Sequence, residues 1–254
     1  MLELNYKTYG QGPALIILHG LFGSLDNWVT HARNLSDNFT VYLIDQRNHG
    51  RSPHAPEMNY AVMAEDLYGF MDQHGIYKAH LLGHSMGGKA VMKFALEYPD
   101  QVDKLLVADM GIKSYPPHHT EILQTLADMD LTQFASRQQA QKAMEAGIPD
   151  QMVQQFLLKS LGRDENKQFR WKFNLQAIRA HYGHILEEID SDFPFEGTTL
   201  FLSGGKSSYV EAADWAHIQA LFPQAKWEVL PTAGHWLHAD QPAAFLQAVR
   251  NFLQ

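Results

Sequence analysis

The sequence contains no cysteine among its 254 residues. This absence excludes disulfide bonds, thiolate metal sites and a cysteine nucleophile, and it leaves the redox compartment open. Long hydrophobic runs are missing too, because no apolar stretch approaches the roughly 18–20 residues that span a bilayer. Residues 1–10 alternate between polar and apolar side chains, so we expect no secretory signal and a cytoplasmic protein.

Positive charge is scarce as well. The chain carries 20 lysine and arginine residues against 28 aspartate and glutamate residues, which gives a formal net charge of −8. Neither nucleic acid nor an anionic membrane attracts an acidic protein, so neither is an expected partner. Hydrophobic residues make up 45% of the chain, as in ordinary globular proteins, and the length suffices for one domain with an insertion. No pattern indicates an oligomeric state.

Short apolar runs alternate with helical patterns in two separate parts of the chain. The runs typical of strands are Leu2–Tyr9, Ala14–Leu18, Thr40–Asp45, His80–Leu82, Lys104–Asp109, Thr199–Leu202 and Lys226–Leu230. Continuous apolar runs are characteristic of strands buried on both faces, as in a parallel sheet covered by helices. The alternation therefore predicts an α/β fold with a mostly parallel central sheet.

The alternation of strand and helix patterns stops between residues 112 and 195. This stretch contains no buried-strand run, and its candidate helices are Glu121–Asp128, Ser136–Ala146, Gln151–Leu161 and Gln176–Ile189. One interpretation is a plain helical packing layer. The favoured one is a lid over the carboxyl end of the sheet, because the alternation resumes afterwards. We therefore expect a core formed by residues 1–111 and 196–254, with a helical cap at residues 112–195.

A pentapeptide with the pattern Gly-x-Ser-x-Gly joins one apolar run to the helix after it. Strand, Gly-x-Ser-x-Gly and helix in this order are the layout of a nucleophile elbow centred on Ser85. Gly83 and Gly87 lack the Cβ atoms that would block so tight a bend. The Met86 N–H lies at the helix start, where it has no intrahelical partner and can face a developing oxyanion. The alternative is a chance pentapeptide.

A serine hydroxyl needs a base to take its proton, and 14 histidines are present. His235 lies between the last strand and the last helix, which places it at the same sheet edge as Ser85. His84 adjoins Ser85 and is expected to point elsewhere. His19 ends a buried strand and is expected to bind loop backbone, while His238 is expected to brace the final helix. Position therefore favours His235 as the base.

A second oxyanion donor is expected in the turn after the strand Ala14–Leu18. The His19-Gly20 pair begins this turn, and the N–H of Leu21 is the predicted partner of the Met86 N–H. The simple alternative is a tight turn without a catalytic role. No metal site is predicted, because His181 and His184 are spaced i, i+3 without a third ligand, and a solvated helix face is favoured.

Five stretches carry a resemblance to a known family: HGLFGSLDNW, DQRNHGRSP, MNYAVMAEDLYGFMD, GHSMGGKAVM and AGHWLHADQP. The chain resembles α/β-hydrolase-fold serine esterases, and in particular the bacterial YbfF-type esterases. The resemblance implies a mostly parallel sheet with helices on both faces and a helical cap insertion. It also implies ester or thioester hydrolysis through an acyl-enzyme at Ser85, with His235 as base and then acid, and no cofactor. Asp45, Arg47 and Asn48 match a family loop that we interpret as scaffold, with Arg47 paired to a carboxylate.

The acidic member of the triad departs from the commonest family pattern, which places it after the strand that follows the insertion. Here that segment is Gly204–Tyr209, which has no carboxylate. Some family members carry the acid after the strand that follows the elbow helix, and in this chain that residue is Asp109. We favour Asp109 over Glu211, although a helix-capping role for Asp109 is the structural alternative. Ser207, with Ser208 as the less favoured alternative, is expected to add a hydrogen bond near His235 from the vacated position.

The substrate is expected to be a small-molecule acyl ester or thioester held in an apolar pocket. The residues expected to form this pocket are Phe22, Met86, Trp236, Met152 and Phe156. Acyl chain length and leaving group are not predicted.

Three isolated lysines, Lys89, Lys113 and Lys206, are candidates for contact with an anionic head group such as a coenzyme A phosphate, with solvated surface as the alternative. Two rival functions stay open. One is different chemistry on the same triad, such as carbon–carbon bond hydrolysis, perhydrolysis or acyl transfer. The other is a ligand receptor without catalysis.

Overall fold

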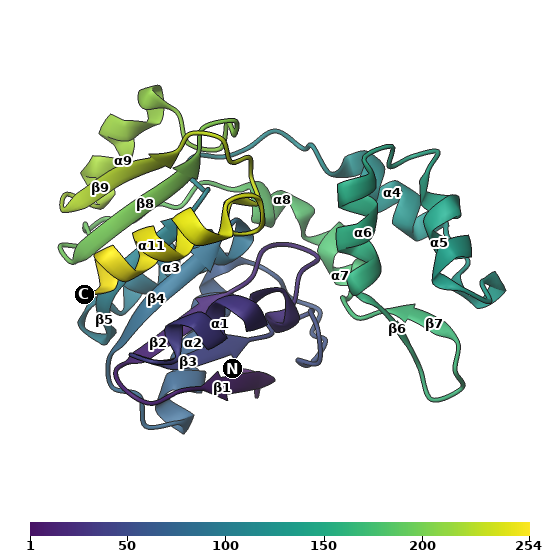
Figure 1. The fold of residues 1–254 in the computed structure, drawn as a ribbon, viewed down its shortest axis with the longest axis horizontal. Helices are drawn as coiled ribbons and strands as arrows, with labels where there is room; N and C mark the ends of the chain where they lie inside the picture. Colours follow the sequence, from purple (N-terminus) through teal and green to yellow (C-terminus); the bar gives the residue numbers. More distant parts are fainter.

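A seven-stranded sheet forms the centre of the computed structural model, which describes residues 1–254 (Figure 1). Its strands are β1 (Tyr6–Tyr9), β2 (Ala14–Leu18), β3 (Thr40–Ile44), β4 (Ala79–His84), β5 (Val102–Ala108), β8 (Thr198–Gly204) and β9 (Ala225–Leu230). Their order in the sheet is β1-β3-β2-β4-β5-β8-β9. All neighbouring strands are parallel except β1 and β3. The sheet confirms the predicted α/β class.

Helices bury both faces of this sheet. Successive side chains of a strand point to opposite faces, and in β2 Ile16 and Leu18 join one core while Leu15 and Ile17 join the other. The first core also contains apolar residues of α2 (Tyr60–Gln73), α3 (Met86–Glu97) and α9 (Trp215–Leu221). The second contains residues of α1 (Val29–Leu35) and α11 (Pro242–Leu253). Short helical turns complete the core: η1 (Leu25–Trp28), η2 (Pro99–Gln101), η4 (Ala212–Asp214) and α10 (Leu237–Asp240).

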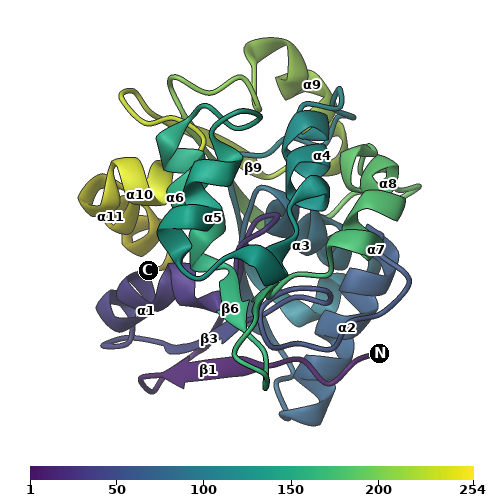
Figure 2. The ribbon, with the colours of Figure 1, turned by 90° about the vertical axis from the view of Figure 1, so that its right-hand side faces the viewer.

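The chain between β5 and β8 forms a separate group of elements, which we call the cap (residues 112–195). Its elements are α4 (Thr120–Asp128), η3 (Leu131–Gln133), α5 (Arg137–Met144), α6 (Gln151–Lys159), β6 (Leu161–Arg163), β7 (Phe169–Trp171), α7 (Leu175–Ala180) and α8 (Tyr182–Leu186). Figure 1 shows the cap to one side of the sheet, and in Figure 2 α4, α5 and α6 stand in front of it.

Two details of the cap differ from the sequence-based expectation. The hairpin β6–β7 was not predicted, because strands of three residues are too short to show a period of two. The helix expected over Gln176–Ile189 is instead divided into α7 and α8 at His181, whose φ of −113° is not helical. Short elements that pack through tertiary contacts leave a weak local signal in the sequence.

The two connections between cap and core are tied to each other and to the elbow helix α3. The Ile189 N–H donates to Ile112 O (2.7 Å), so the outgoing and returning chains pair. Lys89 of α3 has no exposed surface, and its Nζ donates to the carbonyls of Lys113 (2.8 Å) and Glu187. Burial lowers the pKa of Lys89 to about 7. The buried amino group of Lys89 therefore holds both connections against α3.

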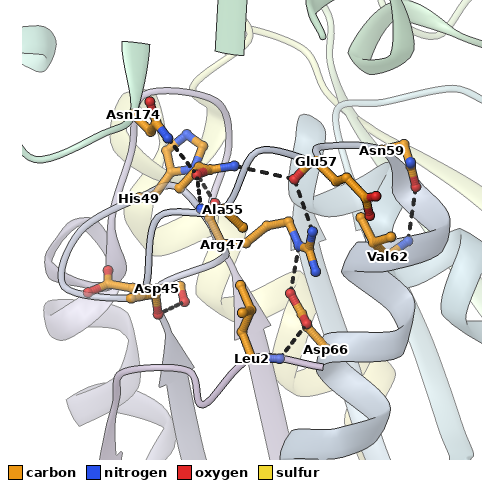
Figure 3. A network of polar contacts seen from close by, with 12 residues as sticks. Leu2, Asp45, Arg47, His49, Ala55, Glu57, Asn59, Val62, Asp66 and Asn174 are labelled. Carbon is orange, nitrogen blue, oxygen red and sulfur yellow. Dashed lines mark hydrogen bonds and ion pairs between the residues drawn. The ribbon is translucent and has the colours of Figure 1, made fainter. Parts of the chain in front are cut away.

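The loop after β3 forms a buried polar network (Figure 3). Arg47 Nε lies 2.7 Å from Asp66 Oδ2, and both side chains are buried, so the expected pairing of Arg47 with a carboxylate is confirmed. The Asp45 carboxylate accepts the N–H groups of Leu25 (2.8 Å) and Arg51 (2.9 Å). This loop therefore joins α2 to the turn that follows β2.

Candidate active site

Three predicted residues meet at the carboxyl edge of the sheet. His235 Nε2 lies 3.0 Å from Ser85 Oγ, and His235 Nδ1 lies 2.7 Å from Asp109 Oδ2. Ser85 follows β4, Asp109 follows β5, and His235 lies in the loop after β9. Parallel strands bring their carboxyl ends to one edge, which is why residues 150 positions apart come into contact.

The backbone at Ser85 is strained into the left-handed region, with a φ of 54°. The flanking glycines make this bend feasible: a Cβ on Gly83 would lie 2.2 Å from Gly87 O, and one on Gly87 would lie 2.4 Å from Leu18 O. The Ser85 N–H donates to Ala108 O (3.1 Å), which fixes the elbow to the end of β5. Tight packing around the elbow thus holds the hydroxyl in place.

Asp109 is fully buried, and its carboxylate accepts three hydrogen bonds. Oδ1 accepts the Gly204 N–H (2.8 Å), while Oδ2 accepts the Ser207 hydroxyl (2.5 Å) and the His235 Nδ1–H. A donor at Nδ1 leaves the lone pair of the His235 ring on Nε2, facing Ser85. Ser207 was expected to bind near His235, and it does so through the carboxylate that His235 also contacts.

The alternative acid, Glu211, is not brought to this site. Its side chain is exposed, binds Lys113 at 3.3 Å, and caps the short helix η4. The first preference of the sequence analysis, Asp109, is the carboxylate that contacts His235.

The two predicted oxyanion donors flank Ser85. A Cβ on Gly20 would lie 3.1 Å from Ser85 Cβ, so the turn after β2 packs directly against the serine. The Leu21 N–H forms no hydrogen bond with the protein. Met86 is the first residue of α3, so its N–H also lacks an intrahelical partner. Neither amide N–H is therefore engaged within the protein.

The imidazoles around His235 are neutral near pH 7. Burial lowers the pKa of His238 to about 3, that of His119 to about 3 and that of His19 to about 4. Burial also places the pKa of His84 well below the usual range of an imidazole. The Nε2 atom of His84 contacts the His235 carbonyl at 2.8 Å and so points away from Ser85. These rings neither compete for the serine proton nor add positive charge beside His235.

Sequence reasoning missed the aromatic neighbours on the cap side of His235. The Tyr209 ring stacks on the His235 ring, with centroids 4.0 Å apart and planes 17° apart. The Tyr209 hydroxyl donates to His118 Nε2 (2.6 Å). Tyr209 ends the segment Gly204–Tyr209, and no spacing rule identifies an aromatic ring that stacks on a histidine.

A cleft of about 770 Å³ opens over Ser85 and His235. Four of the five residues of the predicted pocket line it: Phe22, Trp236, Met152 and Phe156. Met86 does not, because its side chain is buried at 1% exposure. Helix α6 contributes one wall, where the Phe156 ring lies 5.5 Å from the Trp236 ring. The cleft extends beyond the predicted pocket along residues that sequence reasoning did not assign to it: Asn27, Trp28, Thr30, His31, His238, Ala239 and Asp240.

The isolated lysines do not line the cleft. Lys89 is buried against the cap connections, and Lys113 binds Asp214 at 2.7 Å. The hypothesis of contact with an anionic head group is therefore wrong for Lys89, and it stays a prediction for Lys113 and Lys206. His184 binds Glu187 at 2.9 Å, and no group of three His, Asp or Glu side chains is arranged to hold a metal ion.

Comparison with known proteins places this site in a family. The α/β hydrolase fold model matches residues 13–242, so the chain belongs to the α/β-hydrolase family. It is 40% identical to esterase YbfF of Escherichia coli, covering 94% of this chain and 92% of that protein. It is 38% identical to the sn-1-specific diacylglycerol lipase ABHD11 of Danio rerio, covering 100% of this chain and 83% of that protein.

A solved structure agrees with this family assignment. A marine microorganism esterase superposes with a TM-score of 0.97 at 42% identity, covering 99% of this chain and 100% of that one. With these relatives and this fold, the protein is a serine ester hydrolase whose substrates are small-molecule esters. No helix has the length and apolar character needed to cross a membrane.

Proposed function

We propose that the protein cleaves esters through an acyl-enzyme formed on Ser85, with His235 as general base and then acid and with Asp109 as the orienting carboxylate. The observation that carries this proposal is the continuous hydrogen-bonded line from Asp109 through His235 to Ser85, with distances of 2.7 and 3.0 Å. A neutral imidazole whose Nε2 accepts the serine proton is what activation of a hydroxyl requires.

The first half of the proposed reaction forms the acyl-enzyme. Ser85 Oγ attacks the ester carbonyl carbon while its proton passes to His235 Nε2. The carbonyl oxygen becomes an oxyanion that accepts the N–H groups of Leu21 and Met86. Collapse of this intermediate breaks the bond to the alcohol oxygen, which leaves with the proton from His235.

The second half repeats these steps with water. His235 takes a proton from a water molecule, which attacks the acyl carbon. The same two amides stabilise the second oxyanion, and the carboxylic acid departs as Ser85 regains its proton from His235. The Asp109 carboxylate accepts the His235 Nδ1–H and stabilises the imidazolium that forms in each half.

The cleft supports esters with an apolar acyl chain as the substrate class. Phe22, Phe156 and Trp236 line it beside Ser85, and its volume of about 770 Å³ lies in the range of sites for ligands of tens of atoms. The relatives are named as an esterase and as diacylglycerol lipases, and both names fit this class. Thioesters carry the same acyl carbon and are proposed as alternative substrates of the same site.

A chain-length series tests the proposal. Purified protein is assayed with p-nitrophenyl esters from acetate to laurate and with acyl thioesters of the same chains, comparing wild type, Ser85→Ala and Ser208→Ala. We expect Ser85→Ala to lose about 10⁴-fold or more in turnover on every substrate. Ser208 is exposed and forms no side-chain hydrogen bond, so Ser208→Ala serves as the matched control. Wild-type turnover by Ser85→Ala would refute the proposal.

A further inference from the structure

Phe22, the residue after the proposed oxyanion donor Leu21, is held by one hydrogen bond from the core and one from the cap. Its N–H donates to His49 Nε2 (3.2 Å), and its carbonyl accepts the Ser160 hydroxyl (2.7 Å). Its φ is 62°, in the left-handed region that a phenylalanine rarely adopts. Two contacts on one strained residue indicate that the surrounding structure imposes this conformation.

The core contact is built to accept a hydrogen bond. His49 has no exposed surface, and its Nδ1 lies 2.9 Å from Arg47 O, so Nδ1 carries the proton and Nε2 the lone pair. Burial, together with the nearby His19, lowers the pKa of His49 to about 3, which keeps Nε2 an acceptor at neutral pH. The loop that carries His49 thus fixes the Phe22 N–H (Figure 3 shows His49 in this loop).

The cap contact comes from the helix that walls the cleft. Ser160 follows the last residue of α6 and is buried. Its N–H donates to Leu157 O (2.9 Å), and its carbonyl accepts the Lys172 N–H (2.8 Å), which fixes the position of the hydroxyl. The hydroxyl reaches Phe22 O only when α6 and the hairpin are seated on the core.

A neighbouring contact ties the same parts of the molecule together without touching Phe22. Asn174 of the cap donates its N–H to Asn48 O (2.8 Å) and its Nδ2–H to Asn48 Oδ1 (3.1 Å), and Asn174 lies above this loop in Figure 3. This pair holds the cap to the loop of His49. Asn174→Ala removes only the Nδ2–H bond and keeps the backbone bond, so it is a control for the loss of one cap–loop contact that does not touch Phe22.

We propose that His49 and Ser160 are positioning residues that fix the two peptide groups on either side of Phe22 (Leu21–Phe22 and Phe22–Gly23), and thereby the turn that carries the Leu21 N–H, so that the oxyanion site is complete only when the cap is seated. The inference rests on the proposed function. Neither residue touches the reacting atoms. The Leu21 N–H forms no hydrogen bond within the protein, whereas the adjacent Phe22 N–H is occupied by His49. Without either contact, the strained turn relaxes and the donor moves away from the developing charge.

The consequence is selective loss of transition-state binding. Removing one oxyanion donor costs about 10²–10³-fold in kcat, and displacing one costs less, so we expect Ser160→Ala to lower kcat about 10–100-fold. The KM should change by less than about threefold, because the ground-state carbonyl does not depend on this donor. Ser160→Thr retains the hydroxyl and should recover most of the lost kcat.

The test uses two matched inhibitors and p-nitrophenyl butyrate. A butyl trifluoromethyl ketone forms a hemiketal oxyanion with a serine, while the corresponding methyl ketone reports ground-state binding. We expect Ser160→Ala to weaken trifluoromethyl ketone binding by the same factor as kcat and to leave methyl ketone binding unchanged. His49→Leu should act in the same direction, and Asn174→Ala should leave both inhibition constants and kcat at wild-type values.

Two outcomes would overturn the proposal: wild-type kcat in Ser160→Ala, or an equal loss of binding for both ketones, which would indicate a general structural defect. A thermal melt of each variant identifies a failure to fold, and Ser160→Ala decides the matter if His49→Leu does not fold. Labelling of wild-type Ser85 by a fluorophosphonate is measured alongside. An unlabelled, inactive wild type would refute the proposed function instead.

Discussion

Tyr209 lies face to face with His235, at a centroid distance of 4.0 Å and an interplanar angle of 17°. The tyrosine is itself fixed at two further points: its hydroxyl donates to His118 Nε2 (2.6 Å), and its carbonyl accepts the Tyr115 hydroxyl (2.6 Å). His118 and Tyr115 both belong to the cap connection. The plane of the His235 ring is therefore supported by a residue that the cap holds in place.

Replacing Tyr209 should affect the chemical step more than substrate binding. The negative face of the ring stabilises the imidazolium that forms in the transition state and limits rotation of His235. We expect Tyr209→Leu to lower kcat about 10–100-fold, whereas Tyr209→Phe, which keeps the face, should stay within about threefold of wild type. Steady-state kinetics with p-nitrophenyl butyrate measure both. Equal losses in the two variants would show that the hydroxyl contact, and not stacking, is what matters.

The assignment of the acid makes a prediction of its own. Asp109→Asn should lose about 10⁴-fold in turnover, because an amide cannot stabilise the imidazolium and favours the wrong tautomer of His235. Glu211→Gln removes an exposed pair with Lys113 and keeps a side-chain acceptor for the η4 cap, so it should retain wild-type turnover. The two variants are compared by kcat at a single pH. The assignment is wrong if Glu211→Gln carries the large loss and Asp109→Asn does not.

The fold class and the elbow at Ser85 could be predicted from the sequence, because strands, tight bends and helices are specified by residues that are neighbours along the chain. The apolar run before Ser85 and the glycines at 83 and 87 specify strand, bend and helix within a dozen positions. The meeting of Ser85 with His235 could be expected from strand polarity alone. The alignment of their side chains is a tertiary property, and its distances came only from the structure.

The missed features all depend on contacts between distant parts of the chain. Tyr209 acquires its place through stacking on His235, and Ser160 binds a carbonyl 138 positions away. Lys89 resembles a surface lysine in the sequence, yet it is buried, because the two carbonyls it binds belong to the cap connections. A periodic pattern in the sequence cannot indicate a contact with a residue so far away along the chain.

Lys89 should make the stability of the protein depend on alkaline pH. The pKa of Lys89 falls from 10.5 to about 7 on folding, since burial disfavours the ammonium. Between these values the unfolded chain binds a proton that the native state does not, so the free energy of unfolding should rise with pH. A single such group contributes a slope of about 1.4 kcal/mol per pH unit, and this slope should be absent in Lys89→Met.

The free energy of unfolding is measured by urea titration at about pH 7.5, 8.5 and 9.5. All other groups are common to the two proteins, so the difference between wild type and Lys89→Met isolates this residue. Lys93 lies on the same helix, is partly exposed and binds Glu97, and Lys93→Met is the matched control. Parallel pH profiles for wild type and Lys89→Met would contradict the prediction.

The most direct test of the central claim is covalent labelling of the proposed nucleophile. Wild-type protein is treated with a fluorophosphonate, and the modified residue is located by peptide mass spectrometry while esterase activity is followed. We predict one adduct per chain, on Ser85, formed in step with the loss of activity, and none in Ser85→Ala. An adduct on another residue, or full activity after Ser85 is completely labelled, would contradict the account.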